Sequence, residues 1–153
     1  GLAFHPSTGA LWSHEHGPRG GDEINIITTG ENYGWPTVSH GKEYIGGSIG
    51  IGTSAPGLAD PAWVWTPSIA PSGMAFYRGP MFPQLNGHLL VGSLKFKRLY
   101  LVQLSAGVPQ DEFVILDGSI GRVRDVAVES DGAILLLSDE PNGGLYRLSK
   151  AGQ

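Results

Sequence analysis

Three segments of this chain repeat the same order of short elements, and this repetition constrains the fold more than any other feature. Each segment opens with a short apolar strand centred on Ala, continues into a second apolar strand that ends near Ser, and reaches a third strand after a loop. The expected strands are 1–4, 10–13 and 23–28, then 73–76, 88–93 and 98–104, then 125–128, 133–138 and 145–149. The repetition predicts three copies of one supersecondary unit.

The residues around these strands are typical of turns rather than of helices. Gly and Pro together make 35 of 153 residues (24 plus 11), against roughly 18 expected from average usage. No helical apolar period lasts longer than a turn or two, whereas the SDG and NGG stretches suit hairpins. We therefore expect an all-β protein made of antiparallel β-propeller blades.

The expected blade-like repeats run over about 1–36, 73–104 and 125–149, with a long loop at 37–64. A propeller needs about four to eight blades to close its ring. We therefore expect residues 1–153 to form a single partial propeller domain with two open flanks. The alternative is a self-contained β-sandwich whose hairpins share common turn chemistry and which needs no further blades.

Composition narrows the classes of partner. The net charge is −4 and the basic residues form no run, which disfavours nucleic acid as a partner. No apolar stretch is long enough for a membrane span, and residues 1–9 show no signal-peptide pattern. The lack of Cys excludes disulfides and thiolate metal sites but does not fix the compartment.

Three cations occupy equivalent loops of the expected repeats. Loops at one end of a propeller converge on its central channel, and here these loops are 14–23, 65–73, 93–97, 121–125 and 139–144. They carry Lys95, Arg122 and Arg124, of which the two arginines point to the same side of a strand. A polyanionic ligand would suit this cluster, while ordinary solvated charges at strand ends are the alternative.

A Gly-rich loop at residues 16–23 is the other chemical feature. Its backbone carbonyls suit a hard cation such as Ca²⁺, which prefers oxygen ligands and tolerates irregular geometry. His14 and His16 lie two residues apart, which fits no common zinc spacing, so we do not assign them to zinc. The NYGWP stretch at 32–36 can be explained by structural packing alone.

The stretches HGPRGGDEIN and NYGWP, followed in order by APSG, SLK and GRVRDV, resemble the glucose/sorbosone dehydrogenase family. Its members are soluble aldose sugar dehydrogenases that use pyrroloquinoline quinone (PQQ). The resemblance extends from residue 1 to about 149. It implies that the chain supplies the later blades of a six-bladed propeller and that the protein is periplasmic or secreted.

The resemblance also implies the ligands of two metal ions. One Ca²⁺ would lie between the cofactor and two consecutive backbone carbonyls, which correspond here to Gly17 and Pro18. A second, structural Ca²⁺ would be held by carbonyls of the DEIN and NYGWP region, where Glu23 and Tyr33 are the counterparts. Asp22 is expected only to shape the loop.

For the cofactor, the resemblance implies that Lys95, Arg122 and Arg124 hold the carboxylates and quinone oxygens of PQQ. A Trp before the APS segment contacts cofactor or substrate in relatives, and Trp65 is the nearest match, with an uncertain register. The repeat pattern and the resemblance therefore indicate the same three cations.

The reaction implied is the oxidation of aldose sugars to lactones, with a His base taking the anomeric hydroxyl proton and hydride passing to the quinone. That base belongs to earlier blades, before residue 1, and none of the five His residues here matches it. The expected partners are an aldose sugar, the missing N-terminal blades or a second copy of the chain, and a respiratory or artificial electron acceptor. The alternative is a non-catalytic propeller module that binds carbohydrate or protein.

Overall fold

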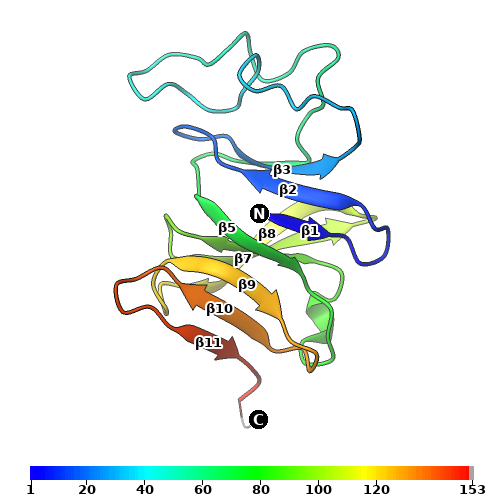
Figure 1. Cartoon of the computed structure of the whole chain (residues 1–153), viewed down its shortest axis with the longest axis vertical. Coiled ribbons are helices and arrows are strands. Elements are labelled where there is room, and N and C mark those ends of the chain that lie inside the picture. The colour runs from blue at the N-terminus through cyan, green and yellow to red at the C-terminus, as the bar shows by residue number, and fades with distance from the viewer. Residues whose placement is uncertain (152–153) are drawn as a thin grey trace.

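The computed structural model describes residues 1–151, which form three antiparallel sheets (Figure 1). The first sheet contains β1 (Leu2–Phe4), β2 (Leu11–Glu15), β3 (Asp22–Ile27) and β4 (Trp63–Trp65). The second contains β5 (Pro71–Phe76), β6 (Leu89–Ser93), β7 (Arg98–Ser105) and β8 (Val108–Asp117). The third contains β9 (Val123–Val128), β10 (Ile134–Ser138) and β11 (Leu145–Leu148), and a short 3₁₀ turn, η1 (Pro83–Leu85), precedes β6.

Each sheet is a meander in which every strand pairs with its neighbour in sequence. The hairpins follow from local turn chemistry, as the β9–β10 turn illustrates. Gly132 has a positive φ of 89°, and the Asp131 carboxylate accepts a hydrogen bond from the Ala133 N–H at 2.9 Å. These contacts reverse the chain within a few residues and bring β9 and β10 into register.

The three sheets stack face to face and enclose two apolar cores. Between the first and second sheets lie Trp12, Ile24, Trp65, Leu89, Val91, Tyr100 and Val102. Between the second and third sheets lie Leu90, Leu99, Leu101, Val123, Val126, Ile134 and Leu136. Alternate residues of β6 point into different cores, which explains why this strand is buried throughout and apolar on both faces.

The outer faces of the stack are less covered. Leu2 and Phe4 on the first sheet are 67% and 70% exposed, and Leu145 on the third sheet is 66% exposed. Within the described residues the third sheet has one strand fewer than the other two, so β11 forms an open edge (Figure 1). Three stacked meander sheets confirm the predicted all-β class and propeller blades, and the two-sheet sandwich alternative does not describe them.

Two strands lie outside the repeats expected from the sequence. The first sheet does not end near residue 36, because β4 returns after a long connection to pair with β3. The second sheet does not end at 104, because β8 adds a fourth strand beside β7. β8 mixes polar and apolar residues on a largely uncovered edge, which hides the alternation expected of a strand. No helix within residues 1–151 has the length and apolar character that a membrane crossing requires.

Candidate functional site

Two adjoining hollows lie at the end of the stack where β2 ends and β3 and β5 begin. The larger, of about 460 Å³, is bordered by His14, His16, Ser72, Gly73 and Arg124, among others. The smaller, of about 310 Å³, is bordered by His16, Gly17, Asp22, Tyr44, Ser68 and Lys95, among others. His16 borders both hollows, so the two hollows form one composite site that is lined by residues of all three sheets and their loops.

The Gly-rich loop is held in a fixed conformation on both sides of Gly17. The Gly17 N–H donates to the Asp22 carboxylate at 2.8 Å, and the Gly17 carbonyl accepts from the Ser68 hydroxyl at 3.0 Å. The Ser68 hydroxyl also accepts from the Gly20 N–H at 2.8 Å. Gly21 has a φ of 73°, and a Cβ there would lie 2.4 Å from the Gly41 nitrogen, so the loop requires glycine at this position.

The expected calcium ligands fit a hard cation in their chemistry. Gly17 borders the smaller hollow, whereas Pro18 borders neither hollow. The Gly17 carbonyl carries one hydrogen bond, from Ser68. The Pro18 carbonyl accepts one from the Lys42 N–H at 2.9 Å. A carbonyl oxygen has two lone pairs, so each can still bind Ca²⁺. No cluster of three or more His, Asp or Glu side chains suited to a metal occurs within residues 1–151.

The three predicted cations lie near this end, with different surroundings. Lys95 borders the smaller hollow, and its Nζ lies 5.1 Å from the centre of the Phe96 ring. Arg124 borders the larger hollow. Arg122 and Arg124 share one carboxylate, with Nη2 to Asp139 Oδ2 distances of 2.8 and 2.9 Å. These hydrogen bonds lower the pKa of Asp139 and hold the two guanidinium groups side by side.

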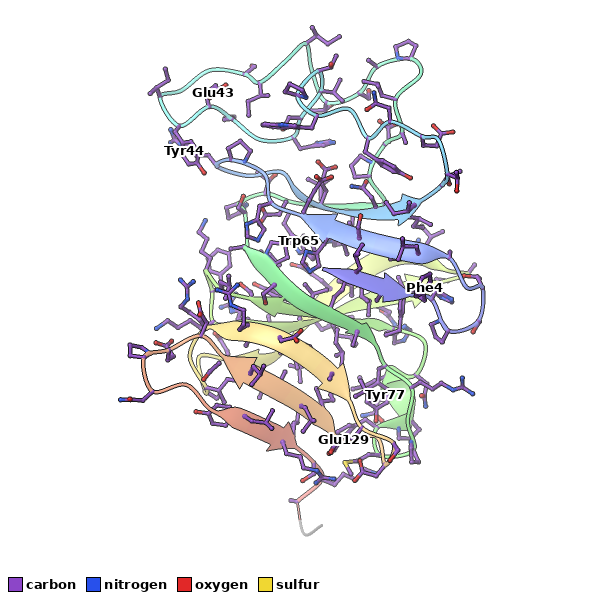
Figure 2. The ribbon with its side chains drawn as sticks, in the orientation of Figure 1. Phe4, Glu43, Tyr44, Trp65, Tyr77 and Glu129 are labelled. Carbon is purple, nitrogen blue, oxygen red and sulfur yellow. The ribbon has the colours of Figure 1, made fainter. Side chains whose placement is uncertain are left out.

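Trp65, the predicted contact for cofactor or substrate, is a buried residue of the first sheet. It is only 3% exposed, lies in the core between the first two sheets (Figure 2) and borders neither hollow. Its indole N–H donates to the Glu112 carboxylate at 2.5 Å. The geometry therefore gives Trp65 a packing role, and a ligand contact by this side chain stays a prediction without structural support.

The side chains of Glu23 and Tyr33 are not brought together. Glu23 lies opposite Glu15 in the β2–β3 register, and burial, followed by the Glu15 charge, raises the pKa of Glu23 to about 7. The Tyr33 hydroxyl donates to the Ile26 carbonyl at 3.0 Å, near the other end of β3. A metal shared by Glu23 and Tyr33 would therefore have to use backbone carbonyls, as the prediction states.

Several bordering residues were given no role from the sequence. Ser68 holds both Gly17 and Gly20, and His16 Nε2–H donates to the Pro71 carbonyl at 2.6 Å. Tyr44 reaches the smaller hollow from the long β3–β4 connection, and its carbonyl accepts from Arg19 Nη1 at 2.8 Å. Only the placement of Ser68 and His16 in the predicted loops could have indicated them, and Tyr44 had no such signal.

His14 adds a buried polar group to the larger hollow. It is 7% exposed, and its Nε2 has no hydrogen-bond partner among the described residues. Burial, followed by the charge of the Gly1 amino group, lowers the pKa of His14 to about 4. His14 is therefore neutral at physiological pH, which agrees with its position beside an apolar core.

Comparisons with known proteins bear on this arrangement. The sequence model described as Glucose / Sorbosone dehydrogenase matches residues 1–147. The chain is 43% identical over 150 residues to an uncharacterized protein of Synechocystis, covering 97% of this chain and 36% of the relative. It is 41% identical over 151 residues to the aldose sugar dehydrogenase YliI of Escherichia coli, covering 97% of this chain and 41% of that protein.

Solved structures give the same result. A crystal structure of a glucose dehydrogenase superposes with a TM-score of 0.93 at 42% identity, covering 98% of this chain and 44% of that one. The apo form of the soluble aldose sugar dehydrogenase of Escherichia coli superposes with a TM-score of 0.92 at 41% identity, covering 96% and 43%. A PQQ-bound aldose sugar dehydrogenase from Streptomyces coelicolor, at 24% identity and a TM-score of 0.74, shares the fold; it covers 97% of this chain and 42% of that one.

This chain spans less than half the length of each of these relatives. Within that span the match is nearly complete, since the family model extends over 147 consecutive residues. The Gly-rich loop and the loops of Lys95 and Arg124, which border the composite site, all lie inside the matched range. The chain therefore belongs to the glucose/sorbosone dehydrogenase family.

Proposed function

We propose that this chain carries the calcium- and PQQ-binding part of an enzyme that oxidises aldose sugars to lactones. One observation carries the proposal: Gly17 and Lys95 border one hollow, and Arg124 borders the hollow that adjoins it. Two relatives support it by their names, the aldose sugar dehydrogenase at 41% identity and a quinoprotein glucose dehydrogenase of Acinetobacter calcoaceticus at 25%.

In this proposal the cations bind and orient an anionic cofactor. Lys95 supplies a compact charge, while Arg122 and Arg124 present planar donors to carboxylates and quinone oxygens. Asp139 holds both guanidinium groups through Oδ2, and each guanidinium has five N–H donors, so donors remain for a ligand. The shared Asp139 thus orients the arginines before the ligand arrives and reduces the rotamer entropy lost on binding.

The carbonyls of Gly17, which borders the smaller hollow, and of Pro18, the next residue, would hold Ca²⁺ beside the cofactor. Bound there, calcium would polarise the quinone as a Lewis acid and PQQ would accept hydride from the sugar. A second, structural Ca²⁺ would use the carbonyls of Glu23 and Tyr33. The proton acceptor is assigned to a His outside this chain, so residues 1–153 would bind and orient the cofactor without completing the reaction.

The outer faces of the first and third sheets would then be covered by further blades of a six-bladed propeller, or by a second copy of this chain. Exposed apolar residues such as Phe4 and Leu145 and the open β11 edge support such a partner. Sedimentation velocity of the chain tests this part, since a well-behaved monomer with a cooperative melt would contradict the need for a partner. A periplasmic or secreted location and a respiratory or artificial electron acceptor complete the proposal.

Titration of the chain with PQQ in the presence of Ca²⁺, followed by absorbance, tests cofactor binding. Lys95→Ala and Arg124→Ala should each weaken binding by roughly tenfold, as expected for loss of a charge-assisted hydrogen bond. Arg147→Ala is the matched control, because Arg147 pairs with Glu129 and Asp131 at the opposite end of the third sheet. It should leave PQQ binding unchanged.

A dye-reduction assay with aldoses completes the test. Binding of PQQ without turnover by the isolated chain is the expected result, because the base is assigned elsewhere. Failure of the wild-type chain to bind PQQ with Ca²⁺ present would contradict the proposal and favour the non-catalytic binding module.

A further inference from the structure

We propose that Asp22 is a positioning residue that couples the Gly-rich loop to the loop of Lys95, so that the metal site and the anion site respond as one unit. The identity of the two ligands rests on the proposed function above. The coupling itself rests on hydrogen bonds within this chain and can be tested without any ligand.

Asp22 joins two segments that are distant in sequence. It is the first residue of β3, is 0% exposed, and uses its two carboxylate oxygens separately. Oδ1 accepts from the Gly17 N–H at 2.8 Å, and Oδ2 accepts from the Ala70 N–H at 2.7 Å. Ala70 lies 48 residues further along the chain, in the segment that leads from the first sheet to the second.

The Ala70 segment in turn holds the loop of Lys95. The Leu94 N–H donates to the Ala70 carbonyl at 3.0 Å, and the Lys95 N–H donates to the Ile69 carbonyl at 3.2 Å. The buried Ser93 hydroxyl donates to the same Ile69 carbonyl at 2.6 Å. Asp22 and Lys95 are therefore joined through a short segment of backbone at Ile69 and Ala70, with hydrogen bonds on both sides.

The backbone at Ala70 indicates that this connection is under constraint. Ala70 has a φ of 53°, in the left-handed region that L-residues other than Asn, Asp and Gly rarely adopt. Such a conformation persists when the surrounding contacts over-determine it. Here the contacts are those of Asp22 on the N–H side and of the Lys95 loop on the carbonyl side, so loosening one side should release the other.

The carboxylate of Asp22 costs more free energy at this buried position than a role in loop shape alone would require. Asp22 takes part in no ion pair among residues 1–151, although it is fully buried. Burial of a charge without a countercharge is unfavourable unless hydrogen bonds or a nearby cation compensate for the lost hydration. Asp22 accepts two backbone hydrogen bonds, and a cation held by the carbonyl of Gly17, whose N–H is one of the two donors, would add to that compensation.

Ser68 provides the matched control. Its hydroxyl contacts the Gly-rich loop at Gly17 and Gly20 and borders the same hollow, but it makes no hydrogen bond to Ala70 or to the Lys95 loop. Ser68→Ala should therefore weaken the metal site alone. Asp22→Asn retains the shape of the side chain but places an N–H₂ group against one of two N–H donors, which breaks the link between the two segments.

The ligand-free arm uses amide NMR of the calcium-free chain. In Asp22→Asn the amide resonances of Leu94 and Lys95 should shift together with that of Gly17, whereas in Ser68→Ala only Gly17 and its neighbours should shift. Unchanged Leu94 and Lys95 resonances in a folded Asp22→Asn chain would overturn the coupling. If Asp22→Asn fails to fold, Ser93→Ala breaks the link from the other side, and it should shift Gly17.

The ligand arm is a double-mutant cycle on PQQ affinity at saturating Ca²⁺. We expect Asp22→Asn alone to weaken binding by roughly tenfold to a hundredfold, as is typical for groups that orient metal ligands. Lys95→Ala should reduce PQQ affinity by a much smaller factor in the Asp22→Asn background than in wild type. In the Ser68→Ala background it should reduce the affinity by the same factor as in wild type. Equal factors in all three backgrounds would overturn the proposal, whereas a wild-type chain that binds no PQQ would contradict the proposed function and leave the NMR arm to decide the coupling.

Discussion

The two junctions between neighbouring sheets are built in different ways. Where the first sheet meets the second, side chains make hydrogen bonds to backbone groups at the end that carries the hollows. These hydrogen bonds join Asp22 to Ala70, Ser68 to Gly17 and His16 to Pro71. Where the second meets the third, the strands approach closely over glycine. A Cβ on Gly73 would lie 2.6 Å from the Asp125 Cα, and the Ser72 hydroxyl donates to the Val123 carbonyl at 2.6 Å.

This difference separates the roles of the two junctions. Polar contacts at the first junction position loops and leave a hollow beside them, so they shape the candidate site. Close backbone approach at the second junction sets the spacing of the inner strands β5 and β9, and the larger hollow opens beside it at the same end of the stack. Variants that disturb the close backbone approach should therefore change stability, and variants of the polar contacts should change binding.

The largest effect is expected for Gly73→Ala at the second junction. The new Cβ would meet backbone atoms of Asp125 and Val126, which cannot move as a side chain can. We expect a loss of about 3 kcal/mol in the free energy of unfolding, typical of severe overpacking, measured by urea denaturation. Gly144→Ala is the control, since its Cβ would meet only the Tyr146 ring, at 3.2 Å or more. A loss no larger than that of the control would break the comparison.

Tyr77→Phe should have the next largest effect. The buried Tyr77 hydroxyl donates to the Gly132 carbonyl at 2.7 Å and accepts from the Phe82 N–H at 2.9 Å, joining the second and third sheets at the end remote from the hollows (Figure 2). Its removal leaves the buried Gly132 carbonyl and the part-buried Phe82 N–H without this partner, at a cost of about 1–3 kcal/mol. Tyr44→Phe, on an exposed ring, should leave the unfolding midpoint unchanged.

Glu23 and His14 lie on opposite faces of the first sheet and should give opposite pH dependences. The folded-state pKa of Glu23 is raised from 4.5 to about 7, so its contribution to stability is present below pH 4.5 and is lost as the pH rises through 7. Glu23→Gln should therefore stabilise the calcium-free chain increasingly over this range, by on the order of 1 kcal/mol at neutral pH after allowance for solvent screening. A gain that does not depend on pH would contradict the burial of this carboxyl.

The folded-state pKa of His14 is depressed from 6.5 to about 4, so its neutral form stabilises the fold above pH 6.5 and that contribution is lost as the pH falls towards 4. His14→Gln should flatten the decline of stability between pH 6.5 and 4. Thermal melts at several pH values with EDTA present measure this. A parallel decline in the variant would assign the acid sensitivity to another group.

Arg147→Ala should have the smallest effect. Both of its ion pairs, to Glu129 and Asp131, involve side chains at least 37% exposed, and exposed pairs contribute little. We expect an unfolding midpoint within error of wild type. A clear loss would show that the outer face of the third sheet contributes more than its exposure suggests.

The sequence was most informative where the chemistry is local. The turns, the repeated strands and the Gly-rich loop follow from short stretches of sequence. The equivalent positions of two loops in the repeats also predict that Lys95 and Arg124 lie at the same end. The β3–β4 pairing and the Asp22–Ala70 hydrogen bond join residues tens of positions apart, and no local pattern encodes them. Trp65 illustrates the same limit, because its burial depends on packing of the second sheet against the first.

The long connection between β3 and β4 has a consequence for protein engineering. It extends from one sheet edge beyond both cores, and it presents Tyr44 to the smaller hollow (Figures 1 and 2). Doubling the length of such a connection costs only about 0.6 kcal/mol in closure entropy. Exchange of this segment between homologues, with the Lys42 contact to Pro18 retained, should therefore change the lining of the smaller hollow at little cost in stability.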